Sequence, residues 1–176
     1  MGYVDNLEKL QAESLRASSD VFEVYIDSIG TEELREKYYG IMLNAAGDME
    51  AAINSVYVSG IRGLAAEIRK HEKNYMLDGD ESHVAAACES VSNFVEAFEN
   101  SKVESEYVCD VRQASRVYKC ALAALAAEDK KISDYSLKIE ESACEMEPIA
   151  ASIASTVLKR SESRGAVVEQ ARSFEL

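Results

Sequence analysis

The chain of 176 residues has few of the residues that interrupt helices or form tight turns. It contains one proline and eight glycines, too few for the many turns of an all-β fold. No stretch sustains the two-residue alternation of apolar and polar side chains that is typical of a strand. The longest runs without a charge, residues 51–61 and 148–158, have eleven residues each, about half of the ~20 that a membrane span needs. The sequence therefore predicts neither a sheet nor a membrane-spanning helix.

Motifs for catalysis and metal binding are missing as well. The four cysteines show no Cys-x-x-Cys spacing, and neither of the two histidines has a glutamate three residues before it, the pattern of di-iron sites in helical bundles. No glycine-rich phosphate-binding motif occurs. We therefore expect no catalytic residue, no cofactor and no metal site. Cys88 and Cys120 stand among alanines, where we expect each thiol to pack as a small apolar group.

The charge is strongly one-sided. Thirty-two acidic residues against nineteen Lys and Arg give a net charge of −13, which argues against direct binding to nucleic-acid phosphates. The first ten residues, MGYVDNLEKL, lack the basic and apolar regions of a signal peptide. We expect a cytoplasmic protein without a membrane span.

Apolar residues that recur at steps of four and three are the main positive signal. Such spacing places them on one helix face, as in the seam of a coiled coil. Four such runs are Tyr38, Met42, Ala45, Met49, Ala52 and Val56; Tyr57, Ile61, Leu64, Ile68, His71 and Tyr75; Val84, Ala87, Val91, Phe94 and Phe98; and Tyr107, Val111, Ala114, Tyr118, Ala121 and Leu125. The last run continues in phase through Ile132, Tyr135 and Ile139.

Helix ends are expected at glycine, proline and capping residues. A first helix over residues 4–29 has an apolar side comprising Leu7, Leu10, Leu15, Phe22, Tyr25, Ile26 and Ile29. Gly30 should end it, and Thr31 should cap the next helix. That next helix should break at residues 47–48 or at residues 60–63, and residues 78–80 should form a turn.

Further along, Asn100 should end a helix, and residues 101–104 resemble a capping box that opens the next one. That helix either continues to Met146 or breaks near residues 128–131. Pro148 is typical of the first position of a final helix. The predicted fold is all-α: a single domain over residues 1–176, an antiparallel bundle of about five to six helices with coiled-coil-like seams. Residues 166–176 would form a short C-terminal helix or a tail.

Two groups of side chains are candidates for binding a partner. Tyr38, Tyr39 and Tyr57 are one group, because tyrosine is enriched at protein interfaces. Glu89, Glu96 and Glu99 are the other, because no lysine or arginine occurs between Lys73 and Lys102 and this helix should carry a negative potential.

The sequence thus favours a non-enzymatic helical-bundle protein that acts through protein–protein contacts, as an adaptor, assembly subunit or regulator. Its partner would be another protein or a further copy of the chain in a homo-oligomer. One alternative is a bundle enzyme or small-ligand sensor with a pocket between its helices. A second alternative is an acidic inhibitor that mimics nucleic acid.

Overall fold

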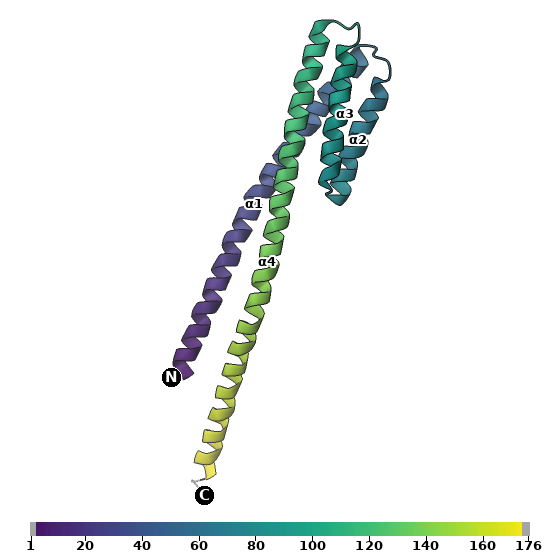
Figure 1. The fold of residues 1–176 in the computed structure, drawn as a ribbon. Helices are drawn as coiled ribbons and strands as arrows, with labels where there is room; N and C mark the ends of the chain where they lie inside the picture. The colour runs from purple at the N-terminus through teal and green to yellow at the C-terminus, as the bar shows by residue number, and fades with distance from the viewer. Residues whose placement is uncertain (1–2, 174–176) are drawn as a thin grey trace. The chain divides into compact units, whose positions relative to one another are not determined.

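The chain folds into four helices in a computed structural model, which describes the backbone of residues 3–173 and the side chains of residues 8–162 (Figure 1). The helices are α1 (Tyr3–Ser55), α2 (Ile61–Asp78), α3 (Glu81–Glu99) and α4 (Ser105–Ser173). Within the described residues there is no strand, so the prediction of an all-α fold is confirmed. The predicted number of five to six helices is wrong, because two expected helix ends lie inside longer helices.

Gly30 does not end a helix. Helix α1 runs through it without a positive φ angle, and Thr31 is buried in the helix interior rather than exposed at a helix start. A glycine inside a helix costs only about 1 kcal/mol relative to alanine. The free energy gained by packing the residues on both sides of Gly30 exceeds a cost of that size.

The break in the second predicted segment falls just before residues 60–63, not at residues 47–48. Gly47 lies inside α1, whereas Gly60 has a φ angle of 76° and immediately precedes α2. A left-handed φ is readily adopted only by glycine. The backbone therefore reverses at Gly60 and stays helical at Gly47.

The turn between α2 and α3 forms as predicted. Gly79 has a φ angle of 71°, and its N–H donates to the carbonyl oxygen of Tyr75 at 2.8 Å. The carboxylate of Asp80 accepts a hydrogen bond from the N–H of Ser82 at 2.8 Å and so caps α3. Helix α3 ends at Glu99, next to the predicted end at Asn100.

Helix α4 differs most from the prediction. It begins at Ser105 rather than within residues 101–104, where the hydroxyl of Ser101 donates to the carbonyl oxygen of Phe98 at 2.6 Å and accepts from the N–H of Val103 at 3.4 Å. It continues through residues 128–131, Met146 and Pro148 to Ser173, so Pro148 does not start a separate helix. Residues 166–173 of the expected C-terminal helix or tail belong to α4, and residues 174–176 lie outside the described residues.

The chain divides into two compact units. The bundle unit comprises residues 29–133, and the paired-helix unit comprises residues 1–28 with 134–176. The expectation of a single domain stays a prediction. Within the described part of the chain, no helix is both long enough and apolar enough to span a bilayer.

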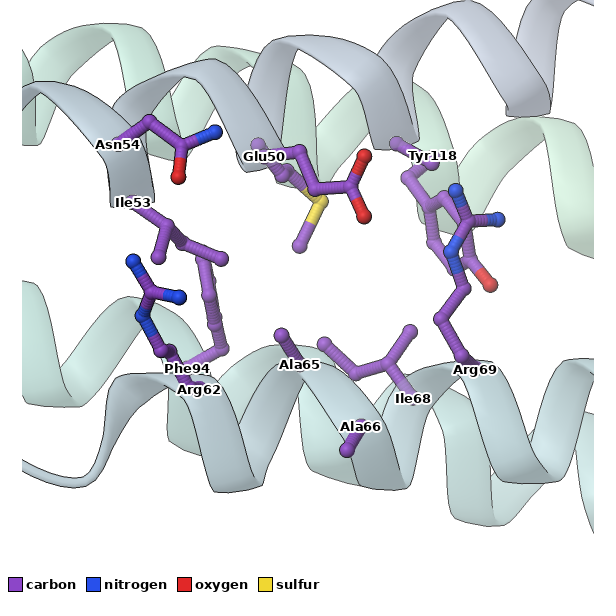
Figure 2. Close-up of a pocket in the computed structure, with 12 residues that line it drawn as sticks. Glu50, Ile53, Asn54, Arg62, Ala65, Ala66, Ile68, Arg69, Phe94 and Tyr118 are labelled. Carbon is purple, nitrogen blue, oxygen red and sulfur yellow. The ribbon is translucent and has the colours of Figure 1, made fainter.

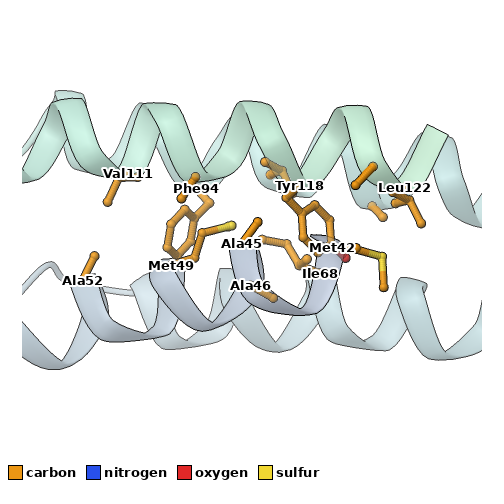
Figure 3. Packing of buried hydrophobic residues seen from close by; sticks show 14 of the residues in the cluster. Met42, Ala45, Ala46, Met49, Ala52, Ile68, Phe94, Val111, Tyr118 and Leu122 are labelled. Carbon is orange, nitrogen blue, oxygen red and sulfur yellow. The ribbon is translucent and has the colours of Figure 1, made fainter. Parts of the chain in front are cut away.

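The bundle unit has one hydrophobic core, to which all four helices contribute (Figure 3). Helices α2 and α3 pack side by side. Met42, Val91, Phe94, Phe98, Tyr118, Leu122 and Leu125 are fully inaccessible to solvent. Burial of a large apolar side chain contributes roughly 1.5–3 kcal/mol, so this core is the main source of stability in the unit. Cys88 packs half-buried against it, but Cys120 is exposed, contrary to expectation.

In the paired-helix unit, the first part of α1 packs on the last part of α4. The hydroxyl of Ser18 lies 3.9 Å from the sulfur of Met146. The half-buried residues of α1 are Leu10, Ser14, Ala17, Val21, Val24 and Ser28. The apolar side expected to be buried is instead exposed at Leu15, Phe22, Tyr25, Ile26 and Ile29. That expectation was wrong because α1 does not end at Gly30. The regular spacing of buried positions that includes Tyr38 and Met42 therefore continues to the N-terminal part of the same helix, and it selects a different face there.

Candidate functional site

The bundle unit contains a pocket of about 320 Å³ between α1 and α2 (Figure 2). Side chains of α1 line one wall and side chains of α2 line the other, while α3 and α4 contribute the floor. The lining residues are Ala46, Met49, Glu50, Ile53, Asn54, Arg62, Ala65, Ala66, Ile68, Arg69, Phe94 and Tyr118. A volume of this size lies at the lower end of the range for small-molecule sites.

The pocket is apolar at its floor and polar at its rim. Phe94 and Tyr118 are fully buried, and Ile68 is nearly so. Glu50, Asn54 and Arg62 are exposed at the opening. An elongated ligand with an apolar body and an anionic end would match this division, because its charged end would meet an arginine.

Tyr118 connects the pocket to a buried group of polar side chains. Its hydroxyl donates to Oε2 of Glu72 at 2.8 Å, and Nη1 of Arg69 lies 3.0 and 2.9 Å from the two oxygens of the same carboxylate. Burial, followed by the charge of Glu72, raises the pKa of the Tyr118 hydroxyl. Tyr118 is therefore a neutral hydrogen-bond donor at ordinary pH rather than a proton acceptor.

A second group also consists of a tyrosine, an arginine and a carboxylate, here an aspartate. The hydroxyl of Tyr75 donates to Oδ2 of Asp129 at 2.6 Å, and Nε of Arg35 donates to Oδ1. Burial is the main cause that raises the pKa of Tyr75, and the hydrogen bond to Asp129 adds to it. In both groups an arginine and a tyrosine share one carboxylate, which satisfies a charge that would be costly to bury alone.

The two histidines meet near the turn between α2 and α3. The rings of His71 and His83 are 6.0 Å apart between centroids, and Nε2 of His83 lies 3.2 Å from Oδ2 of Asp78. Over the residues that the structure describes, no three His, Cys, Asp or Glu side chains come together as a metal site.

The three candidate tyrosines do not form one surface. Tyr38 is half-buried against the core and lines a shallow groove between α1 and α4. Tyr39 is the next residue of α1 and is exposed. Tyr57 is 90% exposed in the segment after α1, beyond Ser55, which lies about 24 Å further along α1 than Tyr39 at 1.5 Å per residue.

The candidate acidic residues lie along α3, but α4 supplies positive charge beside them. Glu89, Glu96 and Glu99 are all exposed. Glu99 forms an ion pair with Arg112, with 2.6 Å between Nη2 and Oε1. The ammonium of Lys119 lies 3.4 Å from the hydroxyl of Ser92, on the same helix as the glutamates. The negative potential of α3 is therefore weaker than the sequence of α3 alone indicates.

Sequence reasoning missed two features. It did not place Arg62 and Arg69 beside the apolar floor of a pocket, since no spacing rule links α1 to α2. It also missed that Leu15, Phe22 and Tyr25 face solvent, although the spacing of Tyr38 and Met42 extended through Gly30 would have shown it.

Comparison of the chain with protein-family models, with characterised proteins and with solved structures gives no match.

Proposed function

We propose that the chain is a non-enzymatic helical protein that acts through protein–protein contacts, as an adaptor, assembly subunit or regulator. The observation that carries this proposal is the exposure of large apolar side chains on the first part of α1. The side chains of Leu15 and Phe22 are 75% and 65% exposed, and those of Tyr25 and Ile26 are 53% and 50% exposed. Contiguous exposed apolar patches in folded proteins usually mark interaction sites.

The pairing of the helices supports the same proposal. The half-buried residues of α1 and α4 in the paired-helix unit recur at steps of three and four, which is the spacing of coiled-coil seams. Several of them are small or polar, such as Ser14, Ala17 and Ser142. A two-helix contact made of such residues buries little apolar area, so the unit gains stability from a further contact. A cytoplasmic location is part of the proposal and rests on the sequence.

Sedimentation velocity of the full chain at micromolar concentration tests this function. We expect either a species larger than one chain or a complex with a recovered partner protein, and we expect Ile26→Glu to abolish it. Leu77→Glu is the matched control, because Leu77 is an exposed apolar residue of α2. A strict monomer with no partner, or a complex insensitive to Ile26→Glu, would contradict the proposal.

A second candidate function is the binding of a small ligand in the pocket between α1 and α2. The apolar floor at Phe94 and Arg62 at the rim favour an amphipathic carboxylate or phosphate. Such a ligand should raise the melting temperature of the wild type, and it should have no effect on Ala65→Phe, in which a ring fills the pocket. Equal shifts in both proteins would exclude this site.

A further inference from the structure

The paired-helix unit has two sides of opposite character. On each helix, the half-buried residues define a packed face. These are Leu10, Ser14, Ala17, Val21, Val24 and Ser28 on α1, and Tyr135, Ile139, Ser142, Met146, Ile149, Ile153 and Thr156 on α4. Each residue turns the helix by about 100°. The residues just before the packed positions therefore lie on one side of the unit, and those just after lie on the other.

The side formed by the preceding residues is charged, and we call it the charged flank. On α1 every one of its residues is ionisable: Lys9, Glu13, Arg16, Asp20, Glu23 and Asp27. On α4 it begins with Asp134, Lys138, Glu141 and Glu145. Lys9 and Glu13 form an ion pair along this flank. A surface of ionisable side chains is stable when it is exposed to solvent.

The side formed by the following residues is mostly apolar, and we call it the apolar flank. On α1 it carries Gln11, Leu15, Ser18, Phe22 and Tyr25, with Ile26 beside them. On α4 it carries Ser136, Ala143, Ala150, Ala154 and Val157, with Ala151 and Leu158 beside them. All of these side chains are exposed. Glu140 and Glu147 are its acidic residues on α4.

The apolar flanks of both helices face the same way. Two antiparallel helices are related by a two-fold axis perpendicular to their common plane, so equivalent sides of the two helices lie on one surface of the pair. The flank therefore forms a continuous surface two helices wide. From Ala143 to Leu158 it extends about 22 Å along α4 at 1.5 Å per residue and is about 20 Å across, which gives on the order of 450 Å².

On this surface, some large side chains of α1 and small side chains of α4 lie at the same position along the axis of the unit. The contact between Ser18 and Met146 sets the register of the two helices. In that register Phe22 of α1 is level with Ala143 of α4, and Leu15 is level with Ala150. Two large residues of α1 are thus level with small residues of α4 that could accommodate them, whereas Ser18 and Tyr25 are level with Glu147 and Glu140.

We infer that the apolar flank binds the apolar flank of a second copy of this chain. A two-fold rotation about the long axis of the unit places α1 of one copy over α4 of the other without changing heights. Phe22 of each copy then packs against Ala143 of the other, and Leu15 packs against Ala150. The contact is self-complementary, as a two-fold dimer requires. Its total buried area of about 900 Å² is that of a weak, reversible interface.

This inference rests on the proposed function and names its partner. A long helix from a different protein would need its own alternation of large and small residues to fit, whereas a second copy provides it. The charged flanks point outward on both sides of such a dimer, where each remains in water.

Complementary charged variants of the full chain test the pairing. Phe22→Glu alone adds a carboxylate near Glu140 and Glu147 of the other copy, and Ala143→Lys alone puts a long side chain where Phe22 packs, so each should weaken dimerisation at least ~100-fold. In an equimolar mixture, Glu at position 22 of one chain meets Lys at position 143 of the other, and the second contact is native. We expect the mixture to form a one-to-one dimer in light scattering coupled to size exclusion. Leu77→Glu should dimerise like the wild type.

Three outcomes would overturn the inference. A wild-type monomer at concentrations up to about 100 µM, well above usual homodimer dissociation constants, excludes the dimer. A dimer that persists in Phe22→Glu excludes this surface, and a mixture that stays monomeric, with both variants as helical as the wild type by circular dichroism, excludes the packing of α1 on α4. If the wild type is monomeric but Ile26→Glu abolishes binding to another protein, only the second copy is wrong and the proposed function stands. If no binding of either kind occurs, both fail.

Discussion

Tyr118 shows how a single side chain allows a charged group into the bundle core. It is fully buried, and its hydroxyl reaches Glu72, which is itself buried and also paired with Arg69. The spacing of α4 places Tyr118 on the core seam, but it does not show which carboxylate receives the hydroxyl. That partner lies on α2, and only the packing of the helices brings the two together.

Replacement of Tyr118 by phenylalanine should destabilise the protein by about 1–3 kcal/mol, because Glu72 keeps its burial and loses one hydrogen bond. Denaturant unfolding followed by circular dichroism measures this change. Tyr107→Phe is the matched control, since Tyr107 also lies on the α4 seam but is only half-buried. Equal losses in the two variants would contradict the role assigned to Tyr118.

The pH dependence of stability gives a second readout of the same residue. Burial raises the pKa of Tyr118 above its ordinary value of 10.0. The folded state therefore keeps the proton when the unfolded chain has begun to lose it. Stability from this group is unchanged below pH 10 and decreases as the pH rises above it.

We expect the melting temperature of the wild type to fall above about pH 10, and we expect a smaller fall in Tyr118→Phe. Because lysines titrate in the same range in both proteins, the difference between the two curves isolates the tyrosine. Parallel curves would show that Tyr118 ionises equally in both states.

At the scale of helices, α4 is unusual because it continues through Pro148. Proline removes one backbone hydrogen bond and disfavours the helix by about 3 kcal/mol. Met146 and Ile149 on either side of it are half-buried against α1, so packing holds the helix together there. Local sequence rules favoured a new helix at Pro148, and contacts with a segment more than a hundred residues away decide otherwise.

Pro148→Ala should therefore strengthen the helix without changing the fold. We expect slower amide hydrogen exchange over residues 141–152 and a higher stability of the paired-helix unit, by up to about 3 kcal/mol. Glu145→Ala is the control, because Glu145 is an exposed residue of the same stretch on the charged flank and the change keeps the proline. Faster exchange in Pro148→Ala would mean that the proline favours the observed path of α4.

The prediction of elements from sequence succeeded where a run of regularly spaced apolar residues is bounded by strong turn residues. Helices α2 and α3 are such cases, since Gly60, Gly79 and Asp80 fix their ends. It failed at Gly30 and Pro148, where a local cost of a few kcal/mol competes with packing along a long helix. The error at Gly30 also led to the wrong buried side for the first part of α1. In an uninterrupted helix, the face that is buried in one part determines which face is buried in the next.

At the scale of the whole molecule, the chain buries one core in the bundle unit and leaves an apolar surface exposed in the paired-helix unit. The all-α class followed from the sequence, and most of the buried core residues belong to the apolar runs found there. The candidate site did not, because Phe22 and Leu15 were expected in a core, and Tyr38, Tyr39 and Tyr57 do not form one surface. A search of the sequence for residues just before and just after the packed positions would have revealed the two flanks.

The central claim is that the apolar flank is a protein contact surface, and hydroxyl-radical footprinting of the wild-type chain tests it most directly. We expect oxidation of Phe22 and Tyr25 to slow markedly as the protein concentration rises into the range where the dimer forms. Tyr57, which is 90% exposed and lies in the bundle unit, should react at a constant rate. If the oxidation rates of Phe22 and Tyr25 stay constant as the protein concentration rises, the flank is not covered by a second copy.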